Sequence, residues 1–150
     1  MLRNIGGVIL GYVIFALTIF LTFSAAYLLM GTSLAFEPGT YEPSTLWLVT
    51  SFVLGVAATI LAGYVCAMIA RGSRAPMALA VLVLVLGLLF AIPVLRAANN
   101  TRERLTRPTE VSNMEAMQNA VQPGWAALLN PFLGFAGVLA GASLRRRPQS

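Results

Sequence analysis

Four long stretches without a charged residue are the feature that most constrains this chain. They are apolar almost throughout, and each contains at least 20 residues. A helix that rises about 1.5 Å per residue needs about 20 residues to cross a hydrocarbon layer of about 30 Å. Strands of a membrane barrel would instead alternate apolar and polar residues over about 10 positions. The sequence therefore predicts four transmembrane helices, at about residues 5–30, 45–70, 76–95 and 124–144.

The predicted fold class is an all-α integral membrane protein, with residues 1–150 forming a single membrane domain. Composition agrees, because 58% of the residues are hydrophobic and 10% are charged, against roughly 45–50% and 25% in a soluble domain. We expect the four transmembrane helices to form an antiparallel bundle. Its connections are an outer loop at 31–44, an inner loop at 71–75 and an outer loop at 96–123, followed by an inner tail at 145–150.

The distribution of charge predicts the orientation of the bundle. The N-terminus, the loop 71–75 and the tail 145–150 together hold six Arg and no Glu, whereas the two outer loops hold four Arg and five Glu. Because positively charged residues concentrate on the cytoplasmic side of a membrane, both termini are expected to be cytoplasmic. Trp47 and Trp125 then fall at the outer ends of their helices, where indole rings anchor a helix in the headgroup layer.

The N-terminus has a second interpretation. Arg3 precedes an apolar run, and Ser33-Leu34-Ala35 has the small residues of a signal-peptide cleavage site. The run is much longer than the 7–15 apolar residues of a signal peptide. This length favours a helix that is retained.

The expected location is a bacterial inner membrane, with the lipid bilayer as the first partner. All basic residues are Arg, and Ala and Gly are abundant, which is compatible with a GC-rich bacterial genome. The run Arg145–Arg147 lies beside the membrane, where each Arg adds about 1 kcal/mol of attraction to anionic lipid. Nucleic acid is not an expected partner, because the net charge of +5 comes without a basic folded surface.

Small residues predict where the helices pack, because lipid tails are as apolar as leucine and give helices no hydrophobic reason to associate. The second predicted helix has a small residue at every fourth position from Ser51 to Ala67, and the first and fourth helices carry GxxxG pairs. These stripes predict close contacts among the first, second and fourth helices, either within the bundle or with another chain. The predicted packing residues are Gly7, Gly11, Ser51, Gly55, Thr59, Gly63, Gly134, Gly137 and Gly141.

The third predicted helix differs from the other three. Its segment Val81–Phe90 is bulky nearly all round. We therefore expect it to face lipid or a partner's side chains more than the other helices do. Pro93 is expected to kink or end it.

The last outer loop is predicted to contain a short amphipathic helix at about 113–121. Ser112 and Glu115 fit a capping box, in which each side chain accepts a hydrogen bond from the backbone N–H of the other residue. Met114 and Met117 fall on one face of this helix. Two interpretations remain open: the methionines rest on lipid or cap the bundle, or they form an adaptable surface for a partner.

A basic cluster in the same loop is a candidate anion or partner surface. Guanidinium groups suit an anionic headgroup, an acidic loop of a partner or a small anion. The alternative is a solvated loop that pairs its own charges. Glu37 and Glu42 of the first outer loop complement the cluster, so the two outer loops are expected to pack as an external cap, and Ser44 is placed to cap the second helix. The cluster consists of Arg96, Arg102, Arg104 and Arg107.

Enzymatic chemistry is not expected of this chain. It has no His, no Asp and no Lys, which excludes imidazole bases, Asp nucleophiles, Schiff-base lysines and His-containing metal sites. The single Cys66 allows neither an intramolecular disulfide nor a thiolate cluster. We interpret Cys66 as a packing residue and expect no catalytic residue, no cofactor and no metal.

By elimination, the sequence predicts a non-catalytic membrane protein that acts through helix packing. It would be an accessory, assembly or scaffold subunit of a larger membrane complex, with other membrane subunits or itself as partners. Ion-coupled carriers keep an ionisable residue at membrane depth, and here all five Glu lie in the outer loops. The alternative is a small homo-oligomeric transporter, pore or lipid-binding protein, whose polar track in the oligomer would be lined by Thr18, Thr22, Ser24, Ser51 and Thr59.

Overall fold

A computed structural model describes residues 2–70, 74–100, 112, 115–116 and 119–145. Within them the chain is mainly helical and contains no β-strand, and an isolated bridge pairs Phe36 with Pro43. All four long helices are apolar enough to cross a membrane, as the sequence predicts. They are α1 (Leu2–Ala35), α2 (Thr45–Ile69), α3 (Arg74–Asn100) and α5 (Gly124–Arg145).

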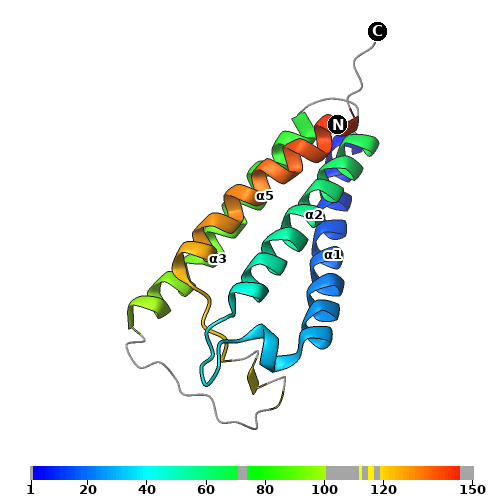
Figure 1. The fold of residues 1–150 in the computed structure, drawn as a ribbon. Helices are drawn as coiled ribbons and strands as arrows, with labels where there is room; N and C mark the ends of the chain where they lie inside the picture. The colour runs from blue at the N-terminus through cyan, green and yellow to red at the C-terminus, as the bar shows by residue number, and fades with distance from the viewer. Residues whose placement is uncertain (1, 71–73, 101–111, 113–114, 117–118, 146–150) are drawn as a thin grey trace.

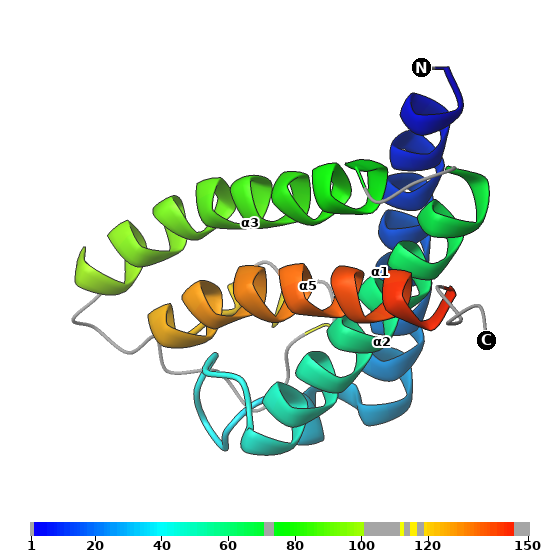
Figure 2. The same ribbon diagram turned by 90° about the horizontal axis from the view of Figure 1, so that it is seen from above.

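The helices form two pairs that cross each other. The start of α1 and the end of α5 lie at the same end of the molecule, here called the terminal end, and the connection 36–44 lies at the opposite loop end (Figure 1). Seen from above, α3 and α5 run side by side, and α3 diverges from α1 with distance from the terminal end (Figure 2). Helix α2 packs against both α1 and α5, so it joins the two pairs.

The connection between α1 and α2 depends on two glycines and a serine. Gly31 interrupts α1 with φ +63° and ψ −178°, a conformation open essentially to glycine alone, and the helix kinks there before ending at Ala35. Gly39, with φ +73°, follows Pro38 in a turn closed by the Thr40 N–H and the Glu37 carbonyl, 3.2 Å apart.

Ser44 caps α2, which confirms the sequence prediction. Its hydroxyl oxygen accepts from the Trp47 N–H at 3.1 Å, and the hydroxyl donates to the Leu34 carbonyl at the end of α1. One side chain thereby satisfies a free N–H of α2 and ties that helix to α1.

Two prolines lie inside helices. Pro93 does not end α3, which continues to Asn100, and Pro131 lies in the second turn of α5. Each proline removes one backbone hydrogen bond to the carbonyl four residues earlier. Apolar helices tolerate this loss where neighbouring groups adjust around it. The prediction that Pro93 could end the helix is therefore wrong, and Arg96 lies within α3 rather than at the start of a loop.

Candidate functional site

Near the terminal end, α1 lies against α2 and α3 at two glycines. A Cβ atom at Gly7 would lie 3.1 Å from the Ala70 Cβ, and one at Gly11 would lie 2.7 Å from the Leu79 Cδ2. Both glycines are buried, whereas most of the α1 residues around them are exposed. The GxxxG pair of the first helix therefore lies at a close helix contact.

The closest packing in the described part of the chain joins α2 to α5. A Cβ atom at Gly63 would overlap the Val138 backbone, and one at Gly141 would overlap the Ile60 backbone. A Cβ atom at Gly137 would overlap the Thr59 hydroxyl. Because two of these neighbours are backbone atoms, they cannot move aside without separating the helices.

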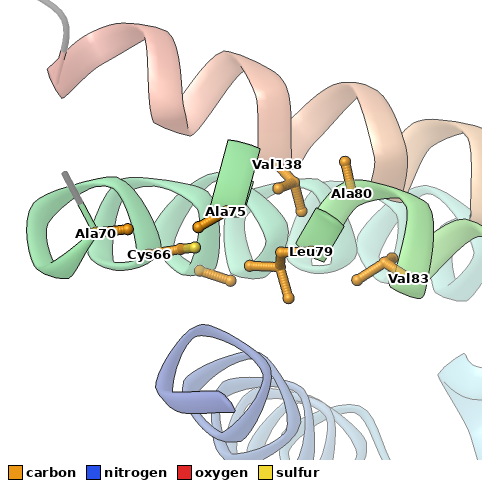
Figure 3. Packing of buried hydrophobic residues seen from close by; sticks show 8 residues of the cluster. Cys66, Ala70, Ala75, Leu79, Ala80, Val83 and Val138 are labelled. Atoms are coloured by element: carbon orange, nitrogen blue, oxygen red, sulfur yellow. The ribbon is translucent and has the colours of Figure 1, made fainter. Parts of the chain in front are cut away.

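Helix α3 completes the core with small and medium residues, in contrast to its predicted exposure. Figure 3 shows Leu79 and Val83 beside Val138 of α5, and Leu79 is fully buried. A Cβ atom at Gly134 would lie 2.9 Å from the Val83 Cγ1. The stripe Ala75, Leu79, Val83, Gly87 and Ala91, at four-residue spacing, was the sequence signal for this contact.

The helix with the least internal packing is α1 rather than α3. In its most apolar 18-residue stretch 6% of the residues are buried, against 22% in α3 and 39% in α5. The bulky run of α3 has one face covered by α5, whose own contact face is made of small residues. The expectation that the third helix is the most exposed is therefore wrong.

Beyond this tight core, the four helices line a half-open apolar cavity of about 300 Å³. It begins beside Thr59 and Val83 and extends from them toward the loop end, where α1 and α3 diverge (Figure 2). Each of the four helices contributes to its wall. Among the lining residues are Phe15, Phe23, Val56, Gly87, Phe90 and Pro131.

Gly55 and Ser51 belong to this cavity rather than to the tight contact of their stripe. A Cβ atom at Gly55 would have no neighbour within 4 Å, although Thr59 and Gly63 of the same stripe are buried against α5. The crossing of α2 and α5 explains the difference, because the two helices lie apart at the loop end (Figure 2). The stripe therefore divides into a contact half and a cavity half.

Some polar groups of the cavity wall already form hydrogen bonds within the protein, and others do not. Thr59, which is 2% exposed, donates to carbonyls of its own helix, Gly55 at 3.1 Å and Val56 at 2.9 Å. Ser51 likewise bonds the Leu48 carbonyl at 2.8 Å. The amides of Gln122 and Asn130 form no such bond with another described residue, and the described lining contains no charged side chain.

A second cavity of about 830 Å³ continues from the first toward the loop end. It shares with the first cavity the wall residues Ile19, Phe23, Ser51, Gln122 and Asn130. Its other walls come from the aromatic end of α1 and the start of α2. The two spaces therefore form one apolar passage with a few uncharged polar groups along it.

An aromatic cluster closes the loop end. Trp47 contacts Tyr27 edge-on, with ring centroids 5.7 Å apart, and Tyr41 and Ala116 are buried nearby. The Val121 N–H donates to the Tyr41 carbonyl at 3.0 Å, which joins the two connections that the sequence analysis paired by charge. The contact that the structure describes between them is apolar and backbone-mediated.

Part of the predicted loop helix lies outside the described residues. The Glu115 N–H donates to the Ser112 hydroxyl at 3.2 Å, which is half of the predicted capping box, and the Asn119 N–H donates to the Glu115 carbonyl at 3.1 Å. Met114 and Met117 lie outside the described residues. So do three members of the basic cluster, Arg102, Arg104 and Arg107.

The remaining predicted residues lie on the surface at the loop end. Arg96 is exposed near the end of α3, and Trp125 is exposed in the first turn of α5 with its ring 5.9 Å from that of Phe52. Trp47 and Trp125 both lie at the loop end of their helices, as the sequence analysis placed them.

The described residues offer no cluster of side chains that could hold a metal ion. No group of three His, Cys, Asp or Glu side chains comes together among them, and Cys66 is buried in the apolar core (Figure 3). Comparisons with protein-family models, curated proteins and solved structures return no match for this chain. The arrangement is suited to binding an apolar chain, because the described lining of both cavities is mostly apolar and uncharged.

Proposed function

We propose that this chain is a multi-pass protein of a bacterial inner membrane that acts by packing rather than by catalysis. Its four helices would form an antiparallel bundle across the bilayer, with both termini cytoplasmic and a short helix in the last outer loop. Its role would be that of an accessory, assembly or scaffold subunit of a larger membrane complex. The excess of Arg in the N-terminus, the loop 71–75 and the C-terminal tail supports this orientation.

The observation that carries the packing role is the unpartnered surface of α1. Large apolar side chains are exposed along its length, including Leu10, Leu17, Phe20 and Leu21. A helix with so little internal packing offers most of its surface to lipid or to a neighbouring helix. We propose that part of this surface contacts another membrane subunit.

The test is co-purification of a tagged copy after gentle solubilisation, followed by native mass spectrometry. Leu17→Trp should reduce the amount of the co-purifying subunit about tenfold, because overpacking a close contact costs about 1–3 kcal/mol. Leu89→Trp on α3 is the matched control, since Leu17 and Leu89 are both 55% exposed. A chain that purifies alone from the native membrane, or equal loss with both variants, would contradict the proposal.

A second candidate function, lipid binding, is favoured by one specific observation. The cavity and its continuation form an apolar passage between helices that would be immersed in the bilayer. Protein interiors are usually packed with few voids larger than a water molecule. Lipid that enters this passage would remain with the protein after extraction from the membrane.

A further inference from the structure

We propose that the cavity holds one hydrocarbon chain of a membrane lipid, and that the Asn130 amide bonds an uncharged oxygen of the same molecule at the loop end. The shared chemistry is a long apolar chain that ends in a carbonyl, ester or hydroxyl. Either a glycerolipid or a free isoprenoid or fatty lipid would supply it. This inference rests on the lipid-binding candidate and names its site and ligand class.

The apolar wall selects the chain. Aromatic and aliphatic side chains such as Phe15, Val56, Val83 and Leu86 form most of the lining. Apolar cavities of this kind stay dry and accept apolar guests, because water has too few hydrogen-bond partners inside them. A volume of about 300 Å³ lies at the lower end of the range for ligand pockets. The adjoining 830 Å³ space takes the part of the molecule that extends toward the loop end.

The distribution of polar groups sets the direction of the lipid. The hydroxyls of Ser51 and Thr59 already bond carbonyls of their own helix, so they offer little to a ligand. Asn130 lies six positions into α5, about 9 Å along the helix at about 1.5 Å per residue, and it borders both cavities. Its side chain forms no hydrogen bond with another described residue. The side chain is exposed at the edge of the two cavities, so a ligand acceptor can reach its amide, and an unpaired amide in hydrocarbon is unfavourable.

The absence of charged side chains from the described wall decides which part of the lipid enters. The described lining of both cavities contains no Arg and no Glu. A phosphate would be desolvated there without a cation. The charged headgroup of a glycerolipid would therefore remain outside the cavity, with the chain and its first oxygen inside.

The decisive experiment compares Gly55→Leu with Gly6→Leu. A Cβ atom at either glycine would meet nothing within 4 Å, but only Gly55 borders the cavity. The wild-type protein, extracted gently and examined by native mass spectrometry, should carry one lipid molecule whose mass distinguishes a glycerolipid from a free isoprenoid or fatty lipid. Gly55→Leu should lower its occupancy at least about tenfold, because the new side chain overpacks the same space, and Gly6→Leu should leave it unchanged.

Asn130→Leu tests the polar end separately. This substitution keeps the side-chain size but removes the amide, and it should weaken lipid retention about fivefold, the value of one hydrogen bond. A wild-type protein without bound lipid would overturn both the inference and the lipid-binding candidate. Equal retention by wild type and Gly55→Leu would overturn the cavity as the site.

A cross-linking measurement keeps the inference testable if a variant fails to fold. Wild-type protein in vesicles of phosphatidylethanolamine and a diazirine-labelled phosphatidylethanolamine should give cross-links on half-buried residues that line the cavity, such as Val56 and Leu86. Cross-links confined to outward residues such as Leu17 and Leu21, which border neither cavity, would leave lipid binding at the surface and reject the cavity. If native mass spectrometry showed a second polypeptide bound to the wild type but not to Gly55→Leu, the lipid would also be rejected as the occupant.

Discussion

The terminal half and the loop half of this bundle use similar residues in opposite ways. At the terminal half, Gly63 and Gly141 bring α2 and α5 into backbone contact, and no side chain larger than hydrogen fits. At the loop half, Gly55 lies on the same helix stripe and borders an open cavity. Small residues therefore permit a close helix contact but do not by themselves produce one. The crossing of the helices decides which small residues are used for packing.

The loop half replaces close helix contact with a different kind of stabilisation. Aromatic rings of Phe23, Tyr27 and Trp47 pack edge-on, and the Ser44 cap and the Tyr41 carbonyl join separate segments. Such local contacts hold the connections in place while the helices behind them stay apart. Substitutions should therefore have larger effects on stability in the terminal half than in the loop half.

The largest effect is expected from Gly141→Val. Its side chain would overlap the Ile60 backbone, so α2 and α5 would have to separate. Overpacking a core costs about 1–3 kcal/mol and occasionally more, and a clash with backbone belongs to the upper end. We expect little or no monodisperse protein by size-exclusion chromatography in detergent. A normal yield with an unchanged thermal midpoint would show that the α2 and α5 contact is not close.

The next effect is expected from Leu79→Ala. Leu79 is fully buried between α1, α2 and α5, and truncating a buried Leu costs about 2–5 kcal/mol through lost contacts and the cavity that remains. Reversible unfolding in mixed micelles measures the change. Leu89→Ala on the exposed face of α3 is the control and should change the free energy of unfolding by less than about 0.5 kcal/mol. Similar losses for both would remove the distinction between the two faces of α3.

The smallest effect is expected from Ser44→Ala at the loop end. The change removes the cap of α2 and the bond to the Leu34 carbonyl, at a cost of about 1 kcal/mol in the same unfolding measurement. Ser143→Ala is the control, because that hydroxyl is exposed and bonds only the Ala140 carbonyl of its own helix among the described residues. A larger loss for Ser44→Ala than for Leu79→Ala would reverse the ranking of the two halves.

The helices could be predicted from the sequence because their cause is local. Charge-free runs and the Ser44 cap depend on residues close together in the chain, and the structure has both at about the predicted positions. Gly31 could not be predicted to kink α1, because glycine is common in apolar helices and its positive φ depends on how the chain must turn toward Ser44.

The cavity could not be predicted because it depends on the angle between distant helices. Ser51, Gly55, Thr59 and Gly63 form one uniform stripe in the sequence, yet the first two border a cavity and the last two are buried. The packing of α3 was missed for a related reason. Its bulky run contains a stripe through Leu79 and Gly87 that packs against α5. This contact depends on the position of Pro131 in α5, because a Cβ atom at Gly87 would lie only 2.8 Å from the Pro131 Cγ.

The most direct test of the two-half account is the same substitution at two positions of one stripe, Gly55→Leu and Gly63→Leu. The measurement is the thermal midpoint of each purified variant in one detergent. The account predicts that Gly55→Leu folds with a midpoint at or above that of the lipid-free wild type, because the leucine fills space that the protein itself leaves open. Gly63→Leu should fail to fold, because its side chain meets the Val138 backbone. Equal destabilisation by both substitutions would contradict the account, since the stripe would then be one continuous contact.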